Sequence, residues 1–449
     1  GCAERFRRHV QEALSLPLPL VKRPQITHRF RRPSKKLSDW QMEPEIHEHL
    51  AGNARRKRVL SMPPQGTTRA KKSAVKSETS NGSNTKRIET MSYKLKSLAL
   101  LGSVFSCVLT GHVGAAELKM ISKAQVPGAP LDSFDISYVD QKTNRYYLAD
   151  RSNKAVDIVD GATDKVVGQI PGFVGFDKDN DTAGPNGVLV IGKEAWAGDG
   201  DSSVKVIDLK SQTIVDTIKT GGKNRADEMA YDPRHHIFIV TNDADDPPFV
   251  TLISTRPGHK ILKKIVFNDA TDGIEQPIYY APKSIFLMTV PEIKGDKSTG
   301  GIAMIDPLKG EVTNVLKVSD CTPAGLARGP GKNLVIGCNA GGKKSTLKPV
   351  TLIVNGDSGA VVASVPDMGA ADEVAYSAKN GQYYISGRQM PNGPVLGVID
   401  ARTNTLLQSI PTGGNAHSVA ASDVNGHVFV PLPKTGGPCG GCIGVYSIQ

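Results

Sequence analysis

The feature that most constrains the fold is a strand-like phrase that recurs at a nearly constant interval along residues 117–449. Each copy is a short apolar run such as VKVID or LGVID, with a hairpin-like pair of runs before it and a turn and a further run after it. The copies end at Asp160, Asp208, Ser254, Asp306, Val354, Asp400 and Ser447, at intervals of 48, 46, 52, 48, 46 and 47 residues. A constant period of this size indicates a chain built from structural repeats.

Each repeat contains four short strand-like runs separated by Gly, Pro, Asn and Asp turns, and 117–449 shows no sustained helical periodicity. Seven such units predict an all-β fold, a seven-bladed β-propeller that forms one domain. Two stacked β-sandwiches are the alternative, but they would not need a constant period. The seventh unit ends after its third run, so we expect the run at 118–126 to supply its outer strand. The last blade would then be closed by the N-terminal strand of the mature chain.

The phrases RYYLADRSNKAVDIVDGATDKVVGQIPG and VLGVIDARTNTLLQSIPTG resemble the YVTN-repeat family of secreted bacterial β-propellers. This family belongs to a wider grouping with amine dehydrogenase heavy chains and lactonase-type propellers, and the resemblance covers all of 117–449. The resemblance is specific for the fold. It does not choose a function, because propellers serve as hydrolases, redox subunits and scaffolds.

The basic charge of the chain is confined to residues 1–90. The formal net charge is +11, and this segment holds 20 of the 55 Lys and Arg residues but only 8 of the 44 Asp and Glu residues. The other 35 basic and 36 acidic residues nearly cancel, so we expect no nucleic-acid binding by the propeller. Runs such as RFRRPSKK bury too little apolar surface to offset chain entropy. We therefore predict that 1–90 is a disordered basic segment.

Residues 91–116 have the layout of a secretory signal peptide. Met91 and two lysines precede an apolar run that is too short to span a bilayer, and small residues end this run before Glu117. Because such signals act at the N-terminus, we infer that the native product starts at Met91, without 1–90. We expect the mature chain to be a periplasmic or secreted monomer without a transmembrane segment.

Four cysteines lie in the mature chain, and an even number in an exported protein predicts two disulfides. Cys321 and Cys338 should face each other across the turn GPGK. Cys439 and Cys442, in PCGGC, should form a local structural disulfide. A redox-active pair is the alternative, but the motif lacks the His that follows it in a haem site, having Ile443 instead, and it lacks the helix start that lowers the pKa of a thiol.

Two adjacent acid pairs, Asp227-Glu228 and Asp372-Glu373, precede the innermost strands of the third and sixth blades. Aligning the seven repeats places both pairs at one rim of the central channel, on opposite sides. Two positions before the first apolar residue of each innermost strand, the aligned polar residues are Asn186, Asp227, Gln276, Asp372 and His417. Strand alternation predicts that these five side chains face the axis, whereas Glu228 and Glu373 point toward adjacent blades.

Carboxylate and amide oxygens that converge on one axis favour Ca²⁺ over Zn²⁺. The sequence therefore predicts a ligand-binding rim and, as a finer hypothesis, a calcium ion held by Asp227, Asp372 and Asn186. The alternative is a water-filled rim whose acids cap turns or pair with Arg225. The acidic loop at 177–187 lacks the Gly and the bidentate Glu of a calcium loop, so we interpret it as solvated.

The leading functional hypothesis is an exported propeller that binds a small ligand or a periplasmic protein partner at this rim. A lactonase-like or metal-assisted hydrolase is the alternative, with a rim cation polarising a carbonyl and His417 as the candidate base. A noncatalytic subunit of a periplasmic redox complex is the third, which the amine dehydrogenase resemblance implies. The sequence leaves enzymatic activity undecided, because the mature chain contains no nucleophile elbow, phosphate loop or zinc-protease motif.

Overall fold

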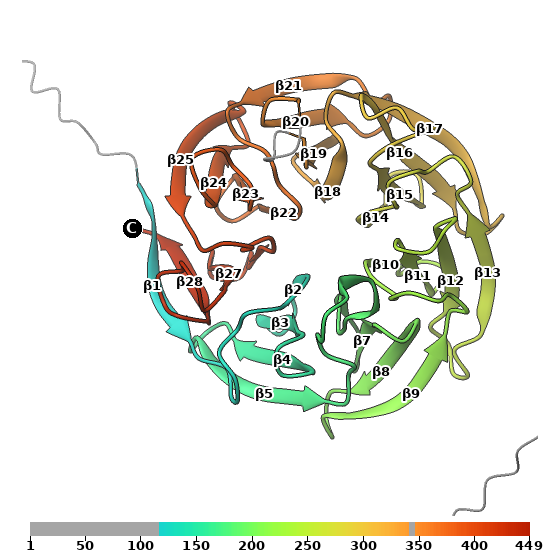
Figure 1. The fold of residues 1–449 in the computed structure, drawn as a ribbon, viewed down its shortest axis with the longest axis horizontal. Coiled ribbons are helices and arrows are strands. Elements are labelled where there is room, and N and C mark those ends of the chain that lie inside the picture. Colours follow the sequence, from blue (N-terminus) through green and yellow to red (C-terminus); the bar gives the residue numbers. More distant parts are fainter. Residues whose placement is uncertain (1–115, 341–345) are drawn as a thin grey trace, which may run out of the picture. The chain divides into compact units, whose positions relative to one another are not determined.

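The computed structural model describes residues 116–340 and 346–449, which form a ring of seven four-stranded antiparallel sheets (Figure 1). In six of these blades the strands follow one another in chain order, from the axis of the ring to its outside. The predicted all-β, seven-bladed propeller is confirmed. Within the described residues, no helix has the length and apolarity needed to span a membrane. The predicted basic segment and signal peptide lie outside the described residues, apart from residue 116.

The strands of the first four blades have the following bounds. Blade 1 contains β2 (Ser137–Asp140), β3 (Arg145–Asp150), β4 (Ala155–Asp160) and β5 (Lys165–Pro171). Blade 2 contains β6 (Val188–Ile191), β7 (Glu194–Asp199), β8 (Ser203–Asp208) and β9 (Thr213–Lys219). Blade 3 contains β10 (Met229–Asp232), β11 (Ile237–Asn242), β12 (Phe249–Ser254) and β13 (Ile261–Val266). Blade 4 contains β14 (Pro277–Tyr280), β15 (Ile285–Val290), β16 (Thr299–Asp306) and β17 (Glu311–Ser319).

The remaining blades contain the other strands. Blade 5 contains β18 (Pro323–Arg328), β19 (Asn333–Cys338), β20 (Val350–Asn355) and β21 (Val361–Pro366). Blade 6 contains β22 (Val374–Ser377), β23 (Gln382–Gly387), β24 (Val395–Asp400) and β25 (Thr405–Pro411). Blade 7 contains β26 (Ala420–Ala421), β27 (Val428–Leu432), β28 (Cys442–Ile448) and β1 (Leu118–Ala124). A short 3₁₀ helix, η1 (Asn180–Thr182), lies between blades 1 and 2 in the sequence.

Blade 7 is assembled from two distant parts of the chain. Its sheet has the order β1-β28-β27-β26, and β1 pairs antiparallel with β28 from Leu118 opposite Ile448 to Ala124 opposite Ile443. The strand at the start of the described chain is therefore the outer strand of the blade that contains the C-terminus (Figure 1).

The Asp that ends the third strand in blades 1, 2, 4 and 6 has a local structural role. The carboxylate of Asp160 accepts hydrogen bonds from the backbone N–H groups of Ala162 and Thr163. Asp208 and Asp400 make the same pair of bonds in blades 2 and 6. Such side-chain to backbone bonds stabilise a tight turn. The repeated Asp therefore sets the turn that leads from the third strand to the outer one.

Burial differs between the middle and outer strands of a blade. All six residues of β11 are buried, whereas exposed and partly buried residues alternate along most of β9. Middle strands are buried on both faces because each blade packs against two neighbours, and outer strands have one face in solvent. Trp196 of blade 2, which is fully buried, packs on Phe238 of blade 3 with ring centroids 4.9 Å apart. The apolar core therefore lies mainly between adjacent blades.

Both predicted disulfides are confirmed. Cys321 is bonded to Cys338, and Cys439 is bonded to Cys442. The first bond connects the segment that leads into β18 with the end of β19, so it fixes the inner half of blade 5. The second is local to the loop that leads into β28.

Candidate functional site

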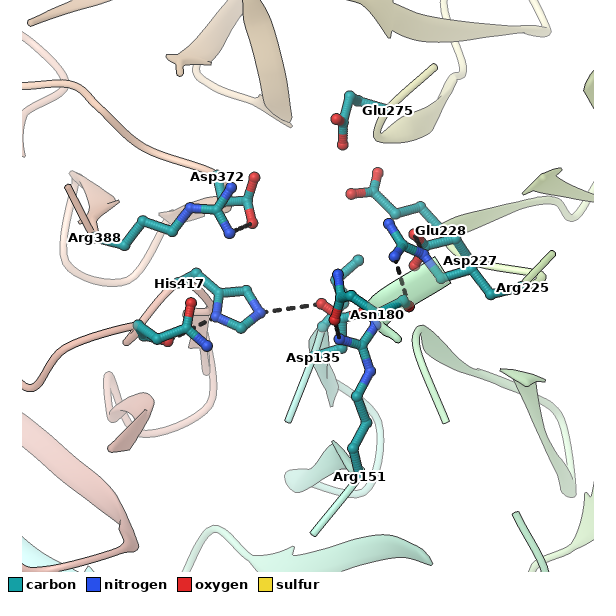
Figure 2. A pocket seen from close by; sticks show the side chains of 12 residues that line it. Asp135, Arg151, Asn180, Arg225, Asp227, Glu228, Glu275, Asp372, Arg388 and His417 are labelled. Atoms are coloured by element: carbon teal, nitrogen blue, oxygen red, sulfur yellow. Dashed lines mark hydrogen bonds and ion pairs between the residues drawn. The ribbon is translucent and has the colours of Figure 1, made fainter. Parts of the chain in front are cut away.

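The inner strands of several blades begin around a cavity of about 130 Å³, which we call the channel mouth (Figure 2). Its wall is almost entirely polar, and blades 1, 3, 4, 6 and 7 and the η1 segment contribute to it. The lining residues are Asp135, Ile136, Arg151, Asn180, Arg225, Asp227, Glu228, Glu275, Asp372, Arg388, Asn415 and His417. Five carboxylates therefore share this wall with three guanidinium groups.

On the side of blades 1 and 2, Arg151 organises the polar contacts. Its guanidinium group forms an ion pair with Asp135 and donates to Asn186 Oδ1, from Nε at 3.0 Å, and to Asn180 Oδ1, from Nη1 at 2.8 Å. Burial alone would raise the pKa of Asp135, but the charge of Arg151 and the hydrogen bond from His417 outweigh it and lower this pKa to about 2. Asp135 is therefore ionised, and the positive charge of Arg151 balances its negative charge.

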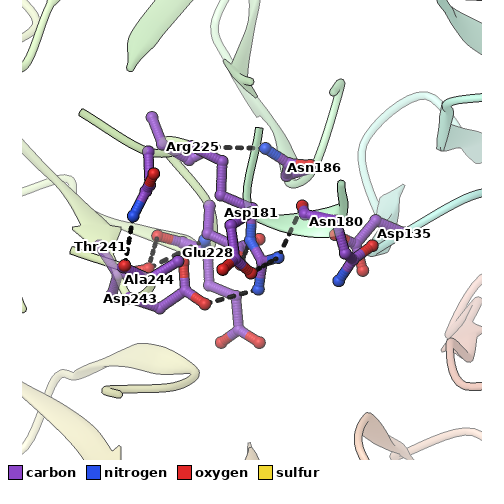
Figure 3. A network of polar contacts seen from close by, with 12 residues as sticks. Asp135, Asn180, Asp181, Asn186, Arg225, Glu228, Thr241, Asp243 and Ala244 are labelled. Atoms are coloured by element: carbon purple, nitrogen blue, oxygen red, sulfur yellow. Dashed lines mark hydrogen bonds and ion pairs between the residues drawn. The ribbon is translucent and has the colours of Figure 1, made fainter. Parts of the chain in front are cut away.

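Arg225 neutralises the next part of the wall (Figure 3). Its Nε donates to Asp227 Oδ2 at 2.6 Å, its Nη2 donates to Asp243 Oδ2 at 2.5 Å, and its Nη1 donates to the carbonyl of Asn180 at 2.9 Å. Burial lowers the pKa of Arg225, but Asp227 and Asp243 more than compensate and raise it well above its usual value. The Arg225 guanidinium, in a side chain that is 13% exposed, thus holds two carboxylates and the backbone of the η1 segment.

His417 lies at the channel mouth with both ring nitrogens engaged. Its Nδ1 is 2.7 Å from the carbonyl oxygen of Asn415, and its Nε2 is 3.1 Å from Asp135 Oδ1. The ring also stacks on Phe134, with centroids 5.2 Å apart. Both partners are hydrogen-bond acceptors, so the two bonds form together only when both nitrogens carry a proton. In this arrangement His417 positions Asp135, and neither nitrogen is free to accept a proton from a substrate.

The side of the wall formed by blades 3 and 4 contains two glutamates. Glu228 is only 7% exposed, and its Oε2 is buried with no hydrogen-bond partner. Burial raises the pKa of Glu228 well above its usual value, and the nearby carboxylates of Glu373 and Glu275 raise it further. The pKa of Glu275 is raised in the same direction by burial and by Asp372. These two acids point into the cavity in Figure 2.

Blade 6 contributes two acids to this region, one in an ion pair and one that accepts a hydrogen bond from another blade. Asp372 forms an ion pair with Arg388 Nη1 at 2.8 Å, while Arg388 Nε is buried without a partner. Glu373 Oε2 accepts a hydrogen bond from Gln276 Nε2 of blade 4 at 2.9 Å. The other amide atom of Gln276, Oε1, accepts from the backbone N–H of Leu326 in blade 5 at 2.5 Å. Gln276 therefore connects three blades behind the cavity wall.

Of the five side chains expected to face the axis, Asp227, Asp372 and His417 line the cavity. Asn186 and Gln276 do not line it, because their amide groups bond to groups of the surrounding blades. The expectation that Glu228 and Glu373 point toward adjacent blades is wrong, because Glu228 lines the cavity and Glu373 reaches across to Gln276 of blade 4. Both glutamates precede the first residue of their strand, Met229 or Val374, so the alternation of a pleated strand does not apply to them.

The proposed calcium ligands are engaged with other groups in this structure. Asp227 and Asp372 are paired with arginines, and Asn186 uses its oxygen for Arg151 and its Nδ2 to donate to the carbonyl of Ala226 at 2.8 Å. Among the described residues, no three His, Cys, Asp or Glu side chains are arranged to hold a metal ion. The calcium site stays a prediction, to be tested by titration.

Several wall residues were missed from the sequence, although the repeat contained a signal for them. Arg151, Asp243 and Arg388 each follow directly the second strand of their blade, in blades 1, 3 and 6. Asp135 occupies the same aligned position as Glu228 and Glu373. Extending the alignment to the ends of the second strands would therefore have found both arginines and Asp243. The acidic loop at 177–187 is not merely solvated, because Asn180 lines the cavity.

Comparisons with known proteins support the fold alone. No family model and no curated protein matches the sequence, so the YVTN-repeat resemblance stays a prediction. The structure is similar to a chain in the crystal structure of the mitotic checkpoint complex, with a TM-score of 0.56 and 12% identity over 81% of this chain and 99% of that one. It is also similar to hydrazine synthase of Kuenenia stuttgartiensis, with a TM-score of 0.56 and 16% identity over 71% of this chain and 98% of that one. At these identities the shared property is the propeller architecture.

Proposed function

We propose that this protein is a propeller that binds a small ligand in the channel mouth. The observation behind the proposal is the buried carboxylate of Glu228, which lines a cavity and has an oxygen without a partner. A buried polar group without a partner is costly in a folded protein, and a bound ligand removes that cost. Small-ligand sites are concave and have a few convergent polar groups, as this cavity has.

The burial of the wall favours a small ligand over a protein partner. Asp135, Asp227 and Glu228 are 8%, 6% and 7% exposed. A protein surface that docks on the rim would contact the loops around the mouth and would not reach the unpartnered oxygen of Glu228. A molecule small enough to enter the cavity would reach them directly.

Hydrolysis has less support in the geometry than binding has. The hydrolase hypothesis needs a base at the channel mouth, and His417 already uses both nitrogens for Asn415 and Asp135. A general base must be able to accept the proton that it abstracts. Binding uses the wall as it stands, without a rearrangement of His417.

Export is part of the same proposal. Disulfides persist in oxidising compartments, and both cysteine pairs of the described chain are bonded. A periplasmic or secreted propeller of the YVTN-repeat type, released after a signal peptide at 91–116, fits these bonds. N-terminal sequencing of the natively secreted protein tests this part, and a mature N-terminus well upstream of Glu117 would contradict it.

A fragment screen by ligand-observed NMR tests the binding function. We expect a subset of small polar fragments to bind the wild-type protein and to lose binding in Glu228→Gln, which keeps the size of the side chain and removes its charge. Glu311→Gln, on the outer strand β17 with a 59% exposed side chain, is the matched control and should bind as the wild type does. Fragments whose binding is unaffected by Glu228→Gln, Arg388→Met and Asp227→Asn would place the ligand elsewhere and overturn the proposal.

A further inference from the structure

The five carboxylates of the channel mouth divide into two sets. Each aspartate of the wall pairs with an arginine: Asp135 with Arg151, Asp227 with Arg225, which also holds Asp243, and Asp372 with Arg388. Glu228 and Glu275 line the same cavity, and neither forms an ion pair within the described part of the chain. All three arginines of the wall are therefore paired with aspartates, and none of them forms an ion pair with Glu228 or Glu275.

From this division we infer that the ligand is a compact organic cation with several N–H donors, of the guanidinium or ammonium class, bound between Glu228 and Glu275. The inference rests on the proposed function and specifies its ligand. Glu228 supplies the observation that separates this site from a surface cluster of acids, because it is more than nine-tenths buried, has an oxygen without a partner and points into the cavity (Figure 2).

The electrostatics of the empty cavity favour a positively charged occupant. An ionised carboxylate without a partner is expensive to bury, so Glu228 and Glu275 need either a proton or a cation nearby. Burial and the neighbouring carboxylates raise the pKa of both groups, which means that protons occupy them readily when no cation is bound. A cation that enters the cavity would therefore displace protons from the two glutamates.

The spacing of the donors favours a polyatomic cation over a metal ion. Among the residues that the structure describes, no three acidic, His or Cys side chains converge closely enough to ligate one metal. The cavity of about 130 Å³ has room for several non-hydrogen atoms. A guanidinium group presents a planar set of N–H donors that bridges separated carboxylates, and an ammonium group presents three donors.

A neighbouring groove offers space for the rest of such a ligand. This second cavity, of about 600 Å³, is lined by Met390, Pro391 and Pro394 among others, and it shares Arg388 and Asn415 with the channel mouth. The shared residues make the two cavities neighbours at blades 6 and 7. A neutral substituent on the cation would extend toward this groove.

Isothermal titration calorimetry of the full chain tests the inference with four probes: methylguanidinium, methylammonium, tetramethylammonium and Ca²⁺. We expect saturable binding of the first two, and none of tetramethylammonium, which has the charge but no N–H donor. Glu228→Gln and Glu275→Gln should each weaken binding at least tenfold, and the double variant should abolish it. Glu311→Gln should leave the affinity unchanged.

A second readout distinguishes this site from nonspecific attraction to acids. Titrations in buffers of different ionisation enthalpy should show that protons are released when methylguanidinium binds near neutral pH, and Glu228→Gln should reduce their number. Binding of tetramethylammonium as tight as that of methylammonium would overturn the requirement for N–H donors. Binding of Ca²⁺ alone would replace the inference with a metal site.

The failure of this inference can be told apart from the failure of the proposed function. If no cation binds but acetate does, and Arg388→Met removes acetate binding, the channel mouth is a ligand site of opposite preference. The binding function then stands and the cation inference falls. If none of these probes and no screened fragment binds in a way that depends on the cavity wall, both fall.

Discussion

The two Asp-Glu pairs occupy equivalent positions in blades 3 and 6, but their surroundings differ. In blade 3, Asp227 shares a buried arginine with Asp243, and Glu228 has an oxygen without any partner. In blade 6, Asp372 has an arginine of its own at a partly exposed place, and Glu373 accepts a hydrogen bond from Gln276. The repeat places the acids, and the residues that reach them from other segments decide their chemistry.

The difference also separates a stabilising role from a binding role. Blade 6 satisfies its acids from within the fold, through Arg388 and Gln276. In blade 3, the Oε2 atom of Glu228 has no hydrogen-bond partner at the cavity. A pair of residues that looks duplicated in the sequence thus contains one structural copy and one copy suited to binding.

The largest expected effect is the loss of Arg225. Arg225→Met leaves Asp227 and Asp243 buried without a counter-charge, and breaking a buried ion pair costs about 3–5 kcal/mol. Arg388→Met removes one ion pair whose side chains are 21% and 19% exposed, so we expect a loss of roughly 1–2 kcal/mol. Urea unfolding of both variants measures the difference. Equal losses would show that the two blades neutralise their acids to the same degree.

The second prediction concerns pH. Glu228 has a folded pKa well above its usual 4.5 because of burial and neighbouring carboxylates, so the folded chain binds more protons than the unfolded chain above pH 4.5. The free energy of unfolding should therefore fall as the pH rises from 5 to 8, by roughly 1.4 kcal/mol for each unit of pKa difference that this range covers. Glu228→Gln should flatten the slope more than Glu373→Gln, since Gln276 also donates to Glu373.

Asp135 provides an internal reference for this experiment. Its folded pKa of about 2 lies below its usual 3.8, so its contribution to stability is present above pH 3.8 and is lost as the pH falls toward 2. That window does not overlap the window of the glutamates. Urea unfolding should be measured in both pH windows. If Glu228→Gln changed the stability only between pH 2 and 3.8 and left the slope between pH 5 and 8 as in the wild type, the raised pKa of Glu228 would be contradicted.

A smaller effect should follow from removing the Gln276 side chain, which connects Glu373 of blade 6 with Leu326 of blade 5. Gln276→Ala leaves the N–H of Leu326 and an oxygen of Glu373 without their partner, at a cost of about 1 kcal/mol or somewhat more. It should also make Glu373 resemble Glu228, with a steeper loss of stability between pH 5 and 8. Chemical unfolding at the two pH values checks both parts. A pH slope identical to that of the wild type would show that the bridge does not tune Glu373.

The smallest expected effect is that of calcium on the aspartates. Asp227 and Asp372 are paired with arginines, so thermal melts in calcium and in chelator should differ little, in the wild type and in the Asp227→Asn/Asp372→Asn variant. A ligand that binds only the folded state raises the melting temperature, and the rise grows with the logarithm of its concentration once this exceeds the Kd. A calcium-dependent rise that disappears in the double variant would show that the two aspartates leave their arginines for a shared ion.

The sequence predicted the architecture better than the chemistry, for a physical reason. The period of the strands and the turn residues between them are local patterns, so they identified seven blades and the place of Asp227 and Asp372 at the mouth. The partners of these acids are not local in the sequence: Asp372 is held by Arg388, and Glu373 by Gln276 of a blade two positions away. The direction of Glu228 was mispredicted because it depends on the loop before β10, where strand alternation does not hold.

The construction of blade 7 has a consequence for the order of folding. The pairing of β1 with β28 joins Leu118 to Ile448, so it is among the contacts with the longest separation along the chain. Contacts of long sequence separation form slowly, because the entropy of closing a large loop must be overcome first. Completion of the ring is therefore expected to be a late kinetic event, after the six blades with local pairing. His417, from blade 7, meets Asp135, from blade 1, across the boundary between the last blade and the first. The channel mouth would thus acquire its final electrostatic balance only in the closing step, which makes ligand binding a reporter of complete folding.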